Sequence, residues 1–231
     1  MKNYFLLLIV YVSFLNGSSD RELFVQGNQF FEQGNFSAAI EKYSAIEKPS
    51  AFVIMNQGVA YFNSEQYAQA RLHFARVQNM GSIRLYWQAK LYDNRIDDRL
   101  QISKEKTTLD TINDYFSAIP LSWLQILIMI CFLFVFYRLY QKKKCCSGLW
   151  VYLLLLLFIV LWAVRYKQNR SIKAVVIEQG DLYVGPDRSF LKKSVVPLGS
   201  VVFVRRQQEN MVEIIVDKQR GWIFSNNLTF I

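Results

Sequence analysis

The pattern of hydrophobic and polar positions changes several times along the chain. A short apolar run near the N-terminus is followed by a stretch that repeats its own pattern of small and aromatic residues. Two long apolar runs come next, and the C-terminal part alternates apolar and polar positions, as half-buried strands do. The predicted order is a leader (1–18), paired helices (20–103), a polar linker (104–119), two apolar helices (120–140 and 149–166) joined by a basic turn (141–148), and a β module (172–231).

The N-terminal run is typical of a secretory signal peptide. Lys2 precedes the apolar residues 4–15, and the small polar residues 16–19 follow them. The run is too short to cross a bilayer, which takes about 20 residues. We predict cleavage near Gly17 or Ser18, and an uncleaved N-terminal anchor is the alternative. Either reading places the residues that follow outside the cytoplasm.

The helical region contains an internal repeat with a constant offset between matched positions. Gly27, Phe30, Phe36, Ala39 and Tyr43 recur as Gly58, Tyr61, Tyr67, Ala70 and Phe74. This order of small and aromatic residues resembles the tetratricopeptide repeat, whose usual period of about 34 residues is slightly longer. A third, degenerate copy begins at Ser82, and we interpret the residues from Ile83 to about Ser103 as a capping helix. Two repeats and a cap predict a small all-α solenoid.

The resemblance to this repeat implies a groove lined by the first helix of each unit. The residues expected to line it are mainly apolar: Phe24, Asn28, Phe31, Phe52, Met55, Val59 and Phe62. We expect an apolar peptide or a neighbouring protein helix as the ligand, and not a C-terminal carboxylate. The alternative is that some of these side chains are buried against the third helix.

The two long apolar runs predict a transmembrane hairpin. Residues 120–140 and 149–166 are bounded by aromatic residues, as the ends of membrane-spanning helices often are. The basic turn between them favours the cytoplasm, but the second run is also followed by basic residues. The predicted signal peptide decides the orientation. We therefore expect a multi-pass protein of a bacterial inner membrane, with both soluble parts on the periplasmic, or outer, face.

The C-terminal part resembles a bacterial SH3 (SH3b) domain. Its Val- and Ile-rich runs are residues 174–177, 182–184, 201–204, 212–216 and 221–224, separated by turn residues. Gly185-Pro186 after the second run and Gly221-Trp222 at the last one carry the resemblance. Tyr183 and Trp222 are candidate surface aromatics, and packing inside the barrel is the alternative. An acidic specificity loop is not evident, so we do not expect binding to polyproline.

Composition and charge narrow the possible functions. The chain is 52% hydrophobic and 16% aromatic with a formal charge of +9, and the excess of basic residues lies beside the apolar runs and in the C-terminal part. It contains no nucleic-acid-reading motif. His73 has no partner at a catalytic or metal-binding spacing, and neither a nucleophile elbow nor a phosphate loop occurs. We expect no enzyme activity, cofactor, metal or nucleic-acid partner.

The order of these segments resembles the BatE-type proteins of bacterial aerotolerance operons. The expected fold class is a multi-domain membrane protein that combines a tetratricopeptide solenoid, a transmembrane hairpin and an SH3-like barrel. The resemblance implies an envelope scaffold that works beside von Willebrand-type Bat proteins and a MoxR-type ATPase. The alternative function is a peptidoglycan-binding accessory or sensor that recruits a hydrolase.

Overall fold

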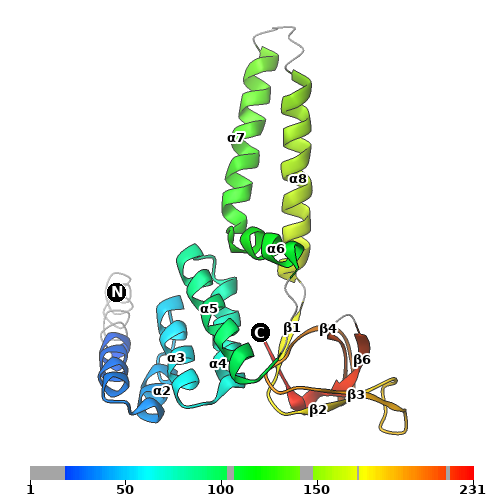
Figure 1. The fold of residues 1–231 in the computed structure, drawn as a ribbon. Coiled ribbons are helices and arrows are strands. Elements are labelled where there is room, and N and C mark those ends of the chain that lie inside the picture. The colour runs from blue at the N-terminus through cyan, green and yellow to red at the C-terminus, as the bar shows by residue number, and fades with distance from the viewer. Residues whose placement is uncertain (1–18, 103–106, 141–147, 171, 217–218) are drawn as a thin grey trace, which may run out of the picture.

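The computed structural model describes residues 19–102, 107–140, 148–170, 172–216 and 219–231. The predicted signal peptide, 1–18, lies outside the described residues, and so does nearly all of the predicted basic turn, 141–148. The helices are residues 19–32, α2 (Phe36–Ser44), α3 (Ala51–Asn63), α4 (Tyr67–Asn79), α5 (Ile83–Arg99), α6 (Thr108–Ala118), α7 (Leu121–Tyr140) and α8 (Gly148–Arg170). The strands follow α8 in the chain (Figure 1).

Residues with short polar side chains cap the N-termini of several helices. The side chains of Asn35, Ser50 and Ser82 accept hydrogen bonds from backbone amides in the first turns of α2, α3 and α5. At α6, Thr107 and Asp110 form a reciprocal capping box. Such caps satisfy amides that have no partner within the helix, and each contributes about 1 kcal/mol. These residues therefore fix where the helices start.

Two glycines bring the helices of each pair close together. A Cβ atom at Gly27 would lie 2.5 Å from the ring of Tyr43, and one at Gly58 would lie 2.7 Å from the ring of Phe74. Both rings are almost completely buried. The two contacts are separated by the repeat offset and have the same geometry, so the repeated residues occupy equivalent places in successive helix pairs.

The C-terminal residues form one antiparallel sheet of seven strands. They are β1 (Lys173–Val176), β2 (Gly180–Tyr183), β3 (Lys192–Val196), β4 (Val201–Gln208), β5 (Met211–Val216), β6 (Gln219–Phe224) and β7 (Leu228–Phe230). The order across the sheet is β3-β2-β6-β5-β4-β1-β7, and the sheet curves around its own core (Figure 1). Leu182, Val202, Ile214 and Ile223 are fully buried in that core.

The helices and the sheet contact each other through α4 and β1. Arg71 of α4 is only 1% exposed, and its Nη1 donates a hydrogen bond of 2.8 Å to the carbonyl oxygen of Gly199, in the turn before β4. A Cβ atom at Gly199 would lie 2.9 Å from Cδ1 of Leu100, just after α5. The paired helices are therefore not a free-standing solenoid, because part of their surface is covered by the sheet.

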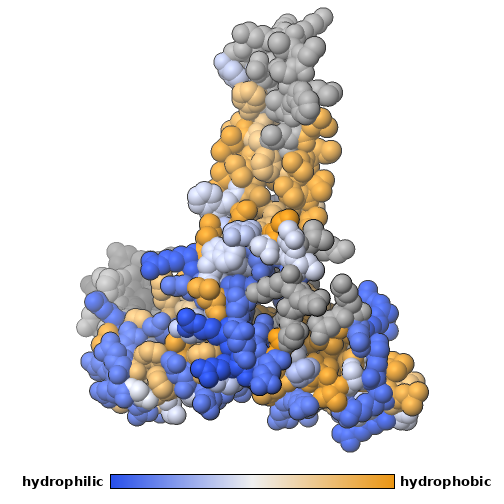
Figure 2. All heavy atoms as spheres, viewed as in Figure 1, coloured by the Kyte–Doolittle hydropathy of each residue, from blue (hydrophilic) through white to orange (hydrophobic). Residues whose placement is uncertain are grey.

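α7 and α8 lie side by side and project away from the rest of the molecule (Figure 1). Most of their side chains that are visible in Figure 2 are hydrophobic, and many are exposed. Within the described residues, no single helix is both long and apolar enough to cross a membrane. Only α6 and α7 taken together, as Asp110–Ala118 and Leu121–Phe134, meet that test, and a bend of 78° separates them.

The predicted fold class, a multi-domain membrane protein with a tetratricopeptide solenoid and a transmembrane hairpin, is therefore wrong. The apolar part of α8 that the structure describes, Leu155–Val164, is well short of the roughly 20 residues that a bilayer requires. The described chain instead combines helices with a seven-stranded antiparallel sheet that packs against them. The two apolar runs do form helices, as predicted. However, a helix whose apolar part is shorter than the bilayer requires does not qualify as a membrane-spanning helix.

Candidate functional site: a groove between three helices

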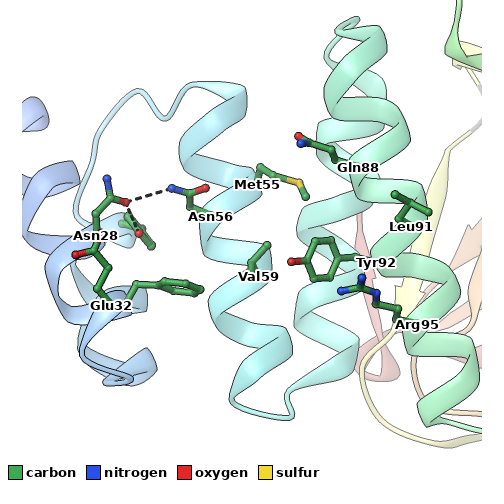
Figure 3. A pocket seen from close by; sticks show the side chains of 11 residues that line it. Asn28, Glu32, Met55, Asn56, Val59, Gln88, Leu91, Tyr92 and Arg95 are labelled. Carbon is green, nitrogen blue, oxygen red and sulfur yellow. Dashed lines mark hydrogen bonds between the residues drawn. The ribbon is translucent and has the colours of Figure 1, made fainter.

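A hollow in the helical part lies between the first helix, α3 and α5. Its volume is about 650 Å³ (Figure 3). One wall comes from residues 19–32, the floor from α3, and the opposite wall from α5. The lining residues mix aromatic, aliphatic and polar side chains: Asn28, Phe31, Glu32, Tyr43, Met55, Asn56, Val59, Gln88, Leu91, Tyr92 and Arg95.

A hydrogen-bonded bridge crosses this groove on one side. Oδ1 of Asn28 accepts a bond of 2.7 Å from the Tyr43 hydroxyl and one of 3.2 Å from Nδ2 of Asn56 (Figure 3). Burial raises the pKa of Tyr43, and the charge of Glu32 adds to this shift, so the hydroxyl keeps its proton and remains a donor. Asn28 therefore ties the first helix to α2 and α3, which fixes this wall of the groove relative to its floor.

The opposite walls carry opposite charges. Glu32 belongs to the first helix and Arg95 to α5. The guanidinium of Arg95 lies over the ring of Tyr92, with Cζ 5.1 Å from the ring centroid. This contact holds the cation at the rim. The groove can thus accept an apolar group against Met55 and Val59 while the rim offers one anion and one cation.

A second hollow of about 520 Å³ lies at the other end of the first helix and α3. Asn56 lines both hollows, so the bridge to Asn28 stands between them. Phe24 and Phe52 line the second hollow together with the basic residues Arg21 and Lys48.

The structure divides the residues predicted for the groove into three groups. Asn28, Phe31, Met55 and Val59 meet in the large groove, whereas Phe24 and Phe52 line the second hollow. Phe62 lines neither of these two hollows. Its ring packs edge-on against Tyr67, at 5.7 Å, and against Tyr92, at 5.4 Å.

The sequence interpretation missed the wall that α5 supplies. Gln88, Leu91, Tyr92 and Arg95 all line the groove. Interpreting this helix as a polar cap hid its role, although Tyr92 follows Tyr61 at the repeat offset and so continues the repeat. Applying the offset to the whole first helix of the third copy would have pointed to these residues.

The two aromatic residues predicted for the β module lie on neighbouring strands. Tyr183 of β2 stands opposite Trp222 of β6, and both are half-buried. The ring of Tyr183 meets Phe224 edge-on at 6.0 Å, and Arg188 lies over Phe224 with Cζ 4.5 Å from the ring centroid. The ring of Tyr183 therefore has a packing partner, and both Tyr183 and Trp222 remain partly exposed.

His73 is buried inside the helical part. Its ring stacks on Tyr61 with the centroids 5.1 Å apart. Burial, with a smaller effect of Arg76, lowers the pKa of His73 to about 4, so the ring is neutral at neutral pH. The described residues contain no group of three or more His, Cys, Asp and Glu side chains that could hold a metal ion.

A scan of protein-family models finds no match to this chain, and neither curated proteins nor solved structures match it significantly.

Proposed function

We propose that this protein is a membrane-associated interaction protein whose helical groove binds a segment of a partner protein. The groove between the first helix, α3 and α5 carries this proposal (Figure 3). Leu91 on its wall is 59% exposed, and Phe31, Val59 and Tyr92 are half-buried, so apolar surface remains available to a ligand. Covering such surface is the main favourable term in most protein association.

The chemistry of the groove favours a segment that is largely apolar with polar ends. Met55 and Val59 offer apolar contact in the centre, and Glu32 and Arg95 can pair with opposite charges on the ligand. Side chains of both kinds on a rigid helical wall suit a helix or an extended peptide. They are less suited to a small polar metabolite, for which the groove lacks a tight enclosure.

The apolar surface of α7 and α8 supports the membrane part of the proposal. Met129, Phe132 and Phe136 are each more than half exposed, and exposed apolar surface on this scale usually marks contact with another protein or with lipid. The resemblance to BatE-type proteins favours lipid. It also favours the outer face of a bacterial inner membrane, with von Willebrand-type Bat proteins and a MoxR-type ATPase as partners.

Selection from a displayed random peptide library, with the full-length chain as bait, tests the groove. We expect enriched peptides with a shared apolar residue, and Leu91→Glu should weaken their binding by about tenfold or more, the loss that follows when about 1.4 kcal/mol of contact is removed. Val25→Glu is the matched control, because Val25 is also an exposed apolar residue on a helix but lines neither described hollow.

Two results would argue against this function. Equal weakening by the two variants would place the peptide site elsewhere on the chain. Tight binding to purified peptidoglycan sacculi that is unaffected by Leu91→Glu would favour a cell-wall accessory instead.

A further inference from the structure

One face of α6 is apolar and largely exposed, although the ring of Trp87 on α5 contacts its Tyr115. Ile112 and Tyr115 are 59% and 64% exposed, and Ile119, directly after the helix, is also exposed. These residues are three and four positions apart, so they form one stripe along the helix. In a helix that only packed on its neighbour, the polar residues would be expected on this outer face.

α6 is held against α5 by contacts along the edge of this stripe. Nζ of Lys90 lies 3.0 Å from Oδ1 of Asp114, and the ring of Trp87 contacts that of Tyr115 with the centroids 4.9 Å apart. The capping box at Thr107 fixes the start of the helix. The stripe is therefore presented in one orientation relative to the groove, whose far wall is the same helix α5.

The stripe continues into the apolar surface of α7. The apolar parts of α6 and α7 meet at an angle of 78°, and Trp123 in the first turn of α7 is 61% exposed. Next to this corner, the turn between α4 and α5 places Gly81 beside Pro120 and exposes Met80 and Ile83. Figure 2 shows hydrophobic atoms along the projecting helices and again near their base.

We propose that α6 and the adjoining turn rest on the surface of a bilayer that contains anionic lipid, so that the groove is held close to that surface. This inference rests on the membrane association proposed above and adds a second contact to it. An amphipathic helix lying in the plane of the interface buries its apolar stripe about 5–10 Å into the boundary between headgroups and acyl chains. Trp and Tyr are enriched at this depth.

Charge complementarity favours anionic lipid over a second copy of the chain. The turn that exposes Met80 and Ile83 lies between the exposed residues Arg76 and Arg84, and Asp114 of α6 is already paired with Lys90. Basic residues near an anionic bilayer contribute about 1 kcal/mol each. Two copies joined through this region would bring these like charges together, which opposes association.

Fluorescent labelling of the full-length chain tests the proposal. In a variant with Cys131, Cys145 and Cys146 replaced by Ser, an NBD group is attached at Tyr115→Cys or at Phe132→Cys on α7. Asp98→Cys, an exposed polar position in the last turn of α5, is the control. The probes are vesicles of phosphatidylcholine alone, or mixed with phosphatidylglycerol, and each mixture is also made with brominated acyl chains.

We expect NBD at positions 115 and 132 to brighten severalfold with the mixed vesicles and to be quenched by bromine, while position 98 stays unchanged. A response at 132 without one at 115 would overturn this inference and leave membrane association standing. No response at either position would overturn both. A response at 115 that is equally strong with pure phosphatidylcholine would overturn the role of anionic lipid, and a response without vesicles that grows with protein concentration would indicate a second copy.

Discussion

At the scale of single residues, buried ionisable groups on α4 and α5 link stability to pH. His73 is nearly inaccessible and its pKa is lowered to about 4, whereas burial raises the pKa of Asp93 despite the opposing effects of Arg71, Gln78 and Lys90. The two shifts act in opposite directions. A depressed histidine pKa makes the fold less stable as the pH falls, and a raised carboxyl pKa makes it less stable as the pH rises.

The effect of His73 can be isolated by substitution. Between its unfolded pKa of 6.5 and its folded value of about 4, the unfolded chain binds a proton that the folded chain does not. The free energy of unfolding should therefore fall by up to about 1.4 kcal/mol per pH unit across this window, and by about 3 kcal/mol in total. Denaturant titrations from pH 7 to pH 4 measure it.

His73→Gln is the appropriate comparison, since Asp93 and the other groups titrate in both proteins. The difference in unfolding free energy between the two proteins should change with pH over this window and level off above about pH 7, where His73 is neutral in both states. A difference that does not depend on pH would contradict the assignment.

At the scale of elements, two positions require glycine for different reasons. One requires it for close packing, and the other for its backbone conformation. Gly58 is helical and faces the ring of Phe74, whereas Gly34 has a φ of +76° and no atom within 4 Å of the place that a Cβ would take. Position 58 requires glycine because the neighbouring ring leaves no room for a Cβ atom, and position 34 requires it because the backbone there is left-handed.

Gly58→Ala should cost about 1–3 kcal/mol, the usual range for overpacking a core, because the methyl group would meet a buried ring at 2.7 Å. Gly34→Ala should cost about 1 kcal/mol, since only the left-handed conformation opposes it. Thermal or denaturant unfolding of both variants measures the difference. A smaller loss for Gly58→Ala than for Gly34→Ala would show that α3 and α4 can move apart at little cost.

Most of the local structure was predictable from such element-scale signals. The constant offset of the repeat located the glycine–aromatic contacts, and each of the five alternating runs overlaps a strand. β3 and β7 were not predicted. β3 is an edge strand that begins with two exposed lysines, and β7 is very short, so neither shows a clear alternation of buried and exposed positions.

At the scale of the whole molecule, Arg71 joins parts of the chain that the sequence treats as separate. Its guanidinium bonds to the Gly199 carbonyl, 128 residues away, and to the carboxylate of Asp97 and the carbonyl of Asp93 on α5. Nothing in local spacing connects these residues. This is why the helices and the sheet were predicted as independent modules.

Replacing Arg71 should uncouple the unfolding of the helices from that of the sheet. Arg71→Met leaves Asp93 and Asp97 without their buried cation, and we expect a loss of about 3–5 kcal/mol, as for other broken buried ion pairs. Unfolding followed by Trp222 fluorescence, in a background whose other four tryptophans are replaced by Phe, and by helical circular dichroism should then separate into two transitions. Arg71→Lys keeps the charge and should retain part of the coupling. Coincident, unshifted transitions in Arg71→Met would contradict this role.

The turn that bears Gly199 also limits where the chain can be engineered. Its glycine adopts a φ of +76°, donates its N–H to the Val176 carbonyl at 2.7 Å and approaches Leu100, so an inserted reporter would push the sheet off the helices. The turn between β4 and β5 at Glu209 and Asn210 is exposed and lies at the far end of both strands. A fluorescent protein or an affinity epitope placed there would leave the groove and its support undisturbed.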